Sequence, residues 1–79
     1  MKKNAVVEYQ GVVVEVLPDA NFRVQLDIDR ADGVKPVILA YTSGTMRERY
    51  IKISIGDAVK VEMSPTDFKR GRIVYRYKK

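Results

Sequence analysis

The side chains best suited to chemistry in this chain are arginines and lysines, and they form two groups in its second half. One group surrounds a short segment that follows a Ser-Gly pair, and the other lies near the C-terminus. Together the two groups comprise Arg47, Arg49, Lys52, Lys69, Arg70, Arg72 and Arg76. Guanidinium groups form forked hydrogen bonds with phosphates and can stack on bases. The two groups therefore indicate binding to a polyanion, of which nucleic acid is the commonest.

The placement of charge along the chain supports this interpretation. Lysine and arginine outnumber aspartate and glutamate by 15 to 10, so the formal net charge is +5. Residues 1–34 sum to −2, whereas residues 35–79 sum to +7. Basic side chains can simply keep a surface soluble, but such a polarised distribution favours a negatively charged partner.

Few side chains could catalyse a reaction or hold a metal. The chain has no histidine and no cysteine, which removes the usual general base at neutral pH and excludes zinc-thiolate sites. Asp27, Asp29 and Asp32 lack the spacing of a calcium loop and favour a solvated hairpin loop. The Ser43-Gly44 pair lacks the context of a phosphate loop or a nucleophile elbow. We expect no catalytic residue, no metal site and no cofactor.

The length of the chain allows one domain, which we expect to span residues 1–79 with flexible ends at 1–5 and 78–79. No apolar run is long enough for a signal peptide, and none approaches the ~18 residues of a membrane span. The absence of cysteine fits the cytosol. These features predict a soluble cytoplasmic protein without a membrane partner, and nothing suggests a dimer.

The elements that must position the basic residues are predicted to be five short strands. Alternating apolar residues, turn clusters and a starting proline place them at residues 6–17, 22–29, 36–41, 58–63 and 72–77. Within the first strand, Gly11 suggests a bulge or a tight bend, and apart from Glu15 both faces of the second half are expected to be buried. The inward side chains expected in the other strands include Phe22, Val24, Leu26, Ile28, Val59, Val61, Met63, Ile73, Tyr75 and Tyr77.

One short helix interrupts the strands. Ser43 is a suitable N-cap, and residues 46–50 allow one or two helical turns between the third and fourth strands. Five strands with a helix in this gap are typical of an all-β OB-fold, a small, partly open Greek-key barrel, whereas a competing SH3-like barrel would place no helix there. An OB-fold binds oligonucleotides through the loop between strands four and five, here residues 64–71, and through strands two and three. Lys69 and Arg70 fall in that loop.

The aromatic residues limit the kind of nucleic acid. Tyr9, Tyr41 and Tyr50 remain as possible base-stacking platforms, with Tyr41 and Tyr50 nearest the basic groups. The paired aromatic strand motifs of RNA-recognition and cold-shock modules are missing. The chain is therefore better suited to folded RNA, recognised through phosphates, 2′-hydroxyls and shape, than to single strands.

The run SGTMRERYIKISIGDAVKVEMSPTDFKRGRIVYR, residues 43–76, closely resembles bacterial translation initiation factor one, an OB-fold, S1-like family. The run EYQGVVVEVLPDANFRVQL, residues 8–26, resembles the opening strands of the same family. The resemblance implies a factor that binds the small ribosomal subunit at the aminoacyl-tRNA site and acts with the other initiation factors. By matching position, decoding-centre rRNA would be approached by Ser43, Gly44, Met46 and Arg47, with further contacts from Arg49, Lys52, Lys69, Arg70, Arg72 and Arg76.

Two positions depart from the family pattern. Thr45 stands where family members commonly carry a basic residue, so one phosphate contact is expected to be missing. The connection Asp27–Lys35 is longer and more acidic than the tight turn usual there, and it could face solvent or a protein partner.

Two other functions fit the residues. One is a general RNA chaperone of cold-shock type, which would bind short single strands. The other is a protein-interaction module whose basic face meets an acidic protein.

Overall fold

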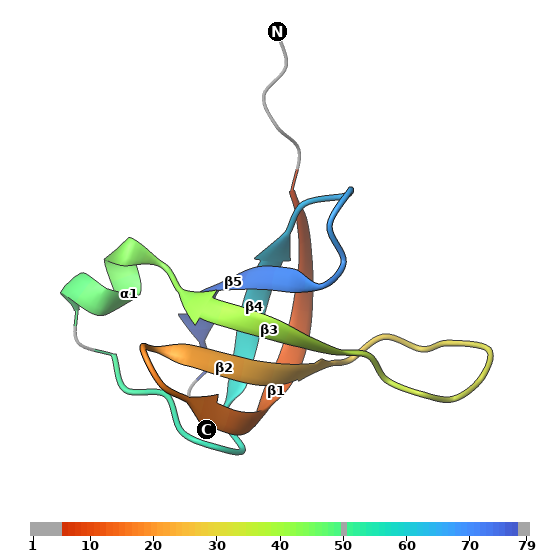
Figure 1. Ribbon diagram of the computed structural model, residues 1–79, viewed down its shortest axis with the longest axis horizontal. Helices are drawn as coiled ribbons and strands as arrows, with labels where there is room; N and C mark the ends of the chain where they lie inside the picture. Colours follow the sequence, from red (N-terminus) through yellow and green to blue (C-terminus); the bar gives the residue numbers. More distant parts are fainter. Residues whose placement is uncertain (1–5, 50, 78–79) are drawn as a thin grey trace, which may run out of the picture.

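The computed structural model describes residues 6–49 and 51–77. Within these residues the chain forms five strands and one short helix (Figure 1). The elements are β1 (Val7–Leu17), β2 (Asn21–Leu26), β3 (Val37–Thr42), α1 (Gly44–Glu48), β4 (Ala58–Met63) and β5 (Arg70–Arg76). Two predictions fall outside the described residues. They are the flexibility of residues 1–5 and 78–79 and the stacking role of Tyr50.

The strands close into a barrel in the order β1-β2-β3-β5-β4, with β4 pairing back onto β1. Every pairing is antiparallel except that of β3 with β5, which is parallel. The helix lies between β3 and β4, as the sequence predicts for an OB-fold. The barrel is closed rather than partly open. Although α1 and β4 lie between β3 and β5 in the sequence, β3 pairs directly with β5, and this pairing completes the ring of strands.

The interior of the barrel is filled by aliphatic side chains from every strand. Val13, Val24, Val59, Val61 and Ile73 are fully buried, and the predicted inward faces of β2 and β4 are confirmed. Each such side chain contributes about 1.5–3 kcal/mol to folding through removal from water.

The second half of β1 is less buried than expected. Val12, Val14 and Val16 are exposed, because no further layer covers the outer face of the barrel here. The bulge lies between Val13 and Glu15, not at Gly11. A Cβ at Gly11 would lie 2.6 Å from Val24 Cγ1 and 2.8 Å from the backbone oxygen of Gln25. Close strand packing, rather than a bend, therefore requires glycine at this position.

A second irregularity changes the faces of β5. Ile73 lies opposite Val61, but Tyr75 lies opposite Lys60, so one extra residue, Val74, is inserted into β5. A β-bulge of this kind breaks the two-residue alternation. Tyr75 is consequently 52% exposed, and its predicted inward orientation is wrong. Its ring lies edge-on to that of the half-buried Tyr77, with the ring centroids 5.0 Å apart.

Candidate nucleic-acid interface

The outer face of β5 presents basic side chains directly beside β3. In the parallel pairing, Arg70 lies next to Leu39 and Arg72 next to Tyr41. All four side chains are exposed. Since alternate residues of a strand are about 7 Å apart, the two arginines are spaced along one edge of an apolar strip. The strip offers both charge for phosphates and an aromatic ring, 44% exposed, for a base.

The preceding loop, residues 64–69, is held against the barrel by its own hydrogen bonds. Asp67 Oδ1 accepts a hydrogen bond from the backbone N–H of Lys69 at 3.0 Å, and the Lys69 carbonyl accepts one from Leu39 N–H at 3.1 Å. The Ser64 and Thr66 hydroxyls lie 3.0 Å apart. These hydrogen bonds fix where Lys69 leaves the loop and where β5 begins.

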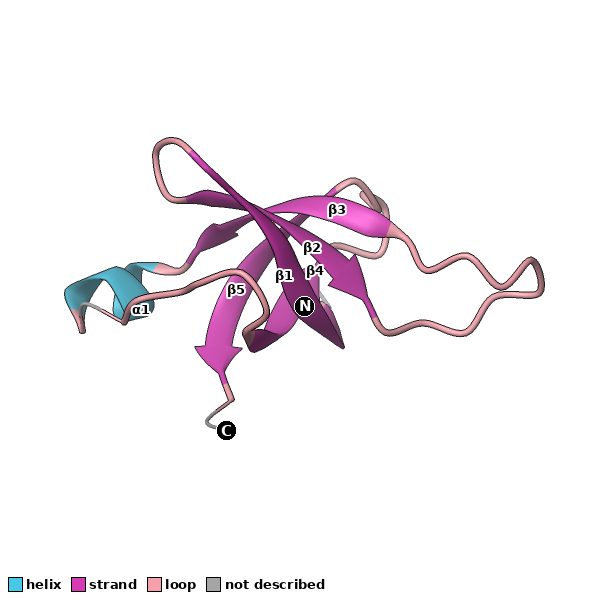
Figure 2. Ribbon diagram, turned by 90° about the horizontal axis from the view of Figure 1, so that it is seen from below, coloured by secondary structure: helices cyan, strands magenta, loops and turns pink. Residues whose placement is uncertain are grey.

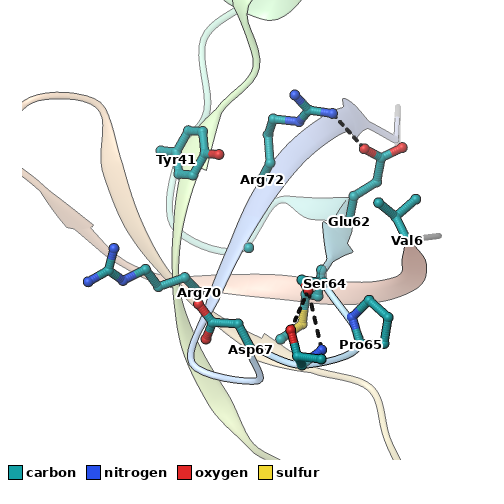
Figure 3. A pocket seen from close by; sticks show the side chains of 11 residues that line it. Val6, Tyr41, Glu62, Ser64, Pro65, Asp67, Arg70 and Arg72 are labelled. Atoms are coloured by element: carbon teal, nitrogen blue, oxygen red, sulfur yellow. Dashed lines mark hydrogen bonds and ion pairs between the residues drawn. The ribbon is translucent and has the colours of Figure 1, made fainter. Parts of the chain in front are cut away.

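A cavity of about 640 Å³ opens between this loop, β3, β4 and β5 (Figure 3). Its charged lining combines the guanidinium groups of Arg70 and Arg72 with the carboxylates of Glu62 and Asp67, and Tyr41 forms one wall. Such a lining offers both hydrogen-bond donors and acceptors to a ligand.

One of the two arginines is partly neutralised. Arg72 Nη2 lies 2.8 Å from Glu62 Oε1 on the neighbouring strand β4. The hydrogen bond to Glu62 raises the pKa of Arg72 above its usual value, and the neighbouring Tyr41 adds a smaller effect in the same direction. Arg72 is therefore always charged, but Glu62 offsets part of the positive potential that it offers to a ligand.

The helix α1 begins as the sequence predicts. Ser43 Oγ accepts a hydrogen bond from the N–H of Met46 at 3.3 Å, which confirms Ser43 as the N-cap. The exposed Arg47 donates through Nε to the Thr42 hydroxyl at the end of β3, also at 3.3 Å. Gly44 is exposed and has open space where a Cβ would stand.

Met46 lies in the hydrophobic core and not on the surface. The family resemblance implies that Met46 approaches RNA, but its side chain is only 2% exposed, so this prediction is wrong. The N-cap at Ser43 turns the first helical residues so that Met46 plugs the end of the barrel, while Thr45 and Arg47 face solvent. Met46 therefore belongs to the support of the interface and not to its surface.

The remaining basic residues do not all share one environment. Arg49, at the C-cap of α1, and the side chain of Lys52 are exposed. Arg76 is half-buried, and its Nη1 donates to the Lys52 carbonyl at 2.6 Å. The exposed members form one set, here named the basic surface: Arg47, Arg49, Lys52, Lys69, Arg70 and Arg72.

β3 connects the two predicted groups, and this placement also brings in a residue that sequence reasoning missed. Arg72 lies beside Tyr41, and Arg47 bonds to the next residue, Thr42. On the other side of β3, Arg23 of β2 lies opposite Leu39 and is paired with Glu15 at 3.0 Å. Arg23 falls in the net-acidic half of the chain, so only the strand register reveals its position.

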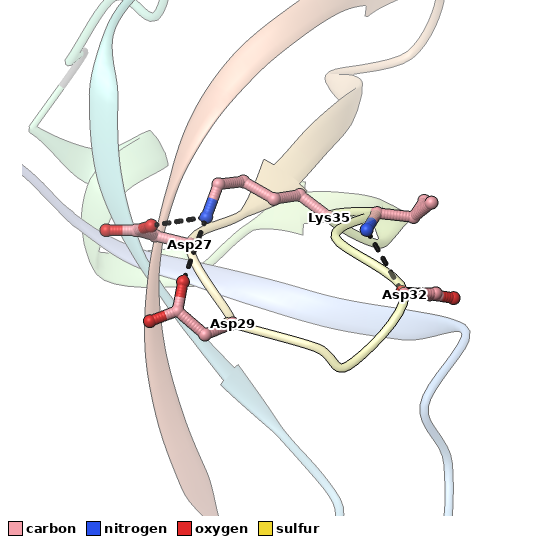
Figure 4. A network of polar contacts seen from close by, with 5 residues as sticks. Asp27, Asp29, Asp32 and Lys35 are labelled. Carbon is pink, nitrogen blue, oxygen red and sulfur yellow. Dashed lines mark hydrogen bonds and ion pairs between the residues drawn. The ribbon is translucent and has the colours of Figure 1, made fainter.

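The long connection between β2 and β3 projects from the barrel on the side away from α1 (Figures 1 and 2). Lys35 Nζ lies 3.1 Å from Asp27 Oδ1 and 3.5 Å from Asp29 Oδ1, and the hydrogen bond to Asp27 raises the pKa of Lys35 (Figure 4). Asp32 is paired with Arg30 at 3.0 Å. The carboxylates of this loop thus use nearby cations as partners.

Metal-binding groups and membrane-spanning helices are both absent from the part of the chain that the structure describes. Among residues 6–49 and 51–77 there is no group of three or more side chains placed to hold a metal ion. Over the same residues, no helix is long and apolar enough to cross a membrane.

Comparisons with known proteins agree with one another. A family model described as Translation initiation factor 1A / IF-1 matches residues 2–79. The solution structure of translation initiation factor IF-1 from the Wolbachia endosymbiont strain TRS of Brugia malayi is 43% identical, with a TM-score of 0.70, covering 92% of this chain and 79% of that chain. The crystal structure of YjeQ from Thermotoga maritima is 24% identical, with a TM-score of 0.65, covering 91% of this chain and 23% of that one, and shares the fold alone.

Proposed function

This chain belongs to the translation initiation factor 1A / IF-1 family, and from that membership we propose that it binds the aminoacyl-tRNA site of the small ribosomal subunit. There its basic surface contacts rRNA of the decoding centre while the other initiation factors are bound. The family is not one of enzymes, and the proposed work of the protein in the cytoplasm is occupation of a site rather than catalysis.

The observation that carries this proposal is the parallel pairing of β3 with β5. It fixes Arg70 beside Leu39 and Arg72 beside Tyr41, and Thr42 links the same strand to Arg47 on α1. A rigid surface of this kind fits folded RNA, because its cations and the phosphates of a folded RNA both have fixed spacing. A flexible single strand has no fixed phosphate spacing and would have to be ordered on binding.

Each part of the surface has a distinct proposed role. The arginines and lysines bind phosphates, and the exposed Tyr41 ring stacks on a base. Ser43 and Gly44 let the backbone approach RNA closely, because both side chains are small. Thr45 supplies no charge, so α1 relies on Arg47 and Arg49.

The direct test replaces one arginine from each end of the basic surface. We expect the double variant Arg47→Ala/Arg70→Ala to bind purified small subunits more weakly, by roughly 1.5–3 kcal/mol for each charge-assisted hydrogen bond removed. The matched control is Arg30→Ala/Lys60→Ala, which removes two positive charges from side chains paired with Asp32 and Glu8. Equal losses in both double variants, or no loss in the first, would count against the assignment.

The exposed aromatic rings favour a second function, that of a general RNA chaperone. Three exposed rings, Tyr41, Phe68 and Tyr75, could stack on the bases of a single strand, as an RNA chaperone requires. Competition between unstructured oligonucleotides and whole small subunits separates the two functions, since we expect an initiation factor to prefer intact subunits by a wide margin. Binding that survives nuclease treatment would instead favour the protein-interaction module.

A further inference from the structure

The bulge in β5 changes the direction of Arg76. Before the bulge, Arg70 and Arg72 occupy the outer face, and simple alternation would continue with residues 74 and 76. The extra residue at Val74 instead places Arg76 opposite Val59, whose side chain is fully buried. Directly opposed residues of an antiparallel pair project on the same side of the sheet. Arg76 is thereby moved from the outer, basic face to the inner end of the barrel.

At that end, Arg76 contacts the chain segment after α1. Its Nη1 donates to the carbonyl of Lys52 at 2.6 Å. Ile51 N–H bonds to the Met46 carbonyl at 3.1 Å, while Ile53 is buried in the core. Residues 51–53 form no helix or strand. For the described residues, the guanidinium of Arg76 gives this segment its only side-chain hydrogen bond.

We propose that Arg76 is a positioning residue: it fixes residues 51–53, and with them the exposed side chain of Lys52, and it does not itself bind rRNA. This assignment rests on the proposed function for what the segment is positioned to do, and it departs from the role that the family resemblance implies. β-Bulges commonly re-aim a side chain beside a functional site. Here the bulge exchanges one potential phosphate contact for a charge-assisted hydrogen bond within the protein.

The first test uses the free protein and is independent of ribosome binding. Arg76→Ala should speed amide hydrogen exchange of Ile51, whose N–H bonds to the Met46 carbonyl, by roughly tenfold or more, because the segment loses the charge-assisted hydrogen bond that holds the Lys52 carbonyl in place. In β2, amide exchange should speed up only as much as the loss of global stability requires. The matched control is Arg72→Ala, which removes the same side chain from the outer face of the same strand and should leave exchange at Ile51 unchanged. Unaltered exchange at Ile51 in Arg76→Ala would overturn the proposal.

The second test uses small subunits and the salt dependence of binding. Removal of one phosphate contact reduces the slope of log K against log [salt] by about 0.7–0.9. Arg70→Ala should show this reduction. Arg76→Ala should weaken binding several-fold through Lys52, so in a Lys52→Ala background the further change Arg76→Ala should leave the slope unchanged. A reduced slope for Arg76→Ala in that background would identify a direct phosphate contact and contradict the proposal.

An uncharged analogue of Arg76 with the same side-chain length distinguishes the effect of the charge from the effect of the side chain's reach. It also provides a test if Arg76→Ala does not fold. Chemical synthesis of the chain allows Arg76→citrulline, which keeps the length and a terminal NH2 donor but replaces the other terminal nitrogen with oxygen and carries no charge. Near-native exchange at Ile51 and near-native binding support the positioning role. Weak binding with a reduced slope excludes it. Should the unaltered protein fail to bind small subunits at all, the proposed function fails, and the exchange measurements still decide what Arg76 does.

Discussion

Arg72 and Glu62 lie side by side on the outer faces of β5 and β4, and their ion pair limits the charge of the basic surface. Glu62 is the more buried partner, with 20% of its side chain exposed against 48% for Arg72. Water screens such a pair strongly, so its own contribution to stability is small, about 0–1 kcal/mol. Its larger effect falls on a ligand, because a phosphate that approaches Arg72 also meets the carboxylate of Glu62.

Glu62→Gln tests this effect. The variant keeps the shape of the side chain but releases Arg72, so we expect small subunits to be bound about two- to fivefold more tightly and with a steeper salt dependence. The control is Glu8→Gln, which makes the same change in net charge at a residue paired with Lys60. Filter binding at two salt concentrations measures both. An equal gain in the two variants would assign the effect to net charge alone.

Close strand packing decides stability at the scale of the elements. β1 pairs with both β2 and β4, and Gly11 lies in both pairings, opposite Leu26 and Val59. The backbone oxygen of Gln25 lies only 2.8 Å from where a Cβ at Gly11 would stand, and a backbone atom in a sheet has little freedom to move. The close packing of β1 on β2 therefore requires glycine at this position.

Gly11→Ala is therefore expected to lower the free energy of unfolding by about 1–3 kcal/mol. For a domain of this size each kcal/mol lowers Tm by roughly 4–8 °C, so thermal unfolding is a sensitive measurement. Gly44→Ala is the matched control, since the space around Gly44 is open and alanine favours a helix. Equal melting temperatures for Gly11→Ala and the unaltered protein would contradict the packing argument.

The connection between β2 and β3 makes many of its contacts within itself, and only its first part reaches the barrel core, through Ile28. Its base is held by the Leu26 N–H to Pro36 carbonyl hydrogen bond of 2.8 Å and by the Asp27–Lys35 pair. It projects away from α1, as Figures 1 and 2 both show. We therefore expect it to contribute nothing to rRNA binding.

Replacement of residues 28–34 with Asn-Gly tests this expectation. The change joins Asp27 and Lys35 by a two-residue hairpin turn, for which Asn-Gly is the preferred sequence. The shortened protein should fold and should bind small subunits with unchanged affinity in a direct titration. A loss of affinity without a loss of stability would show that the loop meets a ribosomal component.

The elements differ in how far the sequence predicts them. Strong alternation in β2 and β4 and the Ser43 cap are local signals, so the strands, the helix and the OB-fold order follow from the sequence. The bulges at Val14 and Val74 leave no local signal, because they arise from pairing with a neighbouring strand. For that reason the sequence predicts the orientation of Tyr75 wrongly and does not reveal the row that joins Arg23, Leu39 and Arg70. The burial of Met46 likewise depends on how α1 packs over the barrel end.

At the scale of the whole molecule, the barrel separates two regions of different character. The first 34 residues are net negative and include β1, β2 and most of the connection after β2, whereas the strongly positive remainder forms β3, α1, β4 and β5. Such a polarised molecule approaches an anionic surface in a preferred orientation, and its association is steered by long-range attraction. Orientation thus comes from the uneven distribution of charge, and the final fit comes from the rigid β3–β5 pairing.

Chemical probing of small-subunit rRNA measures the central claim most directly. At saturating protein in a low-salt buffer, we expect nucleotides of the decoding centre to be protected. The Arg47→Ala/Arg70→Ala variant should lose this protection at the same concentration, and the Arg30→Ala/Lys60→Ala control should keep it. Unchanged reactivity of the decoding-centre nucleotides with the unaltered protein bound would contradict the account, as would protection confined to another part of the subunit.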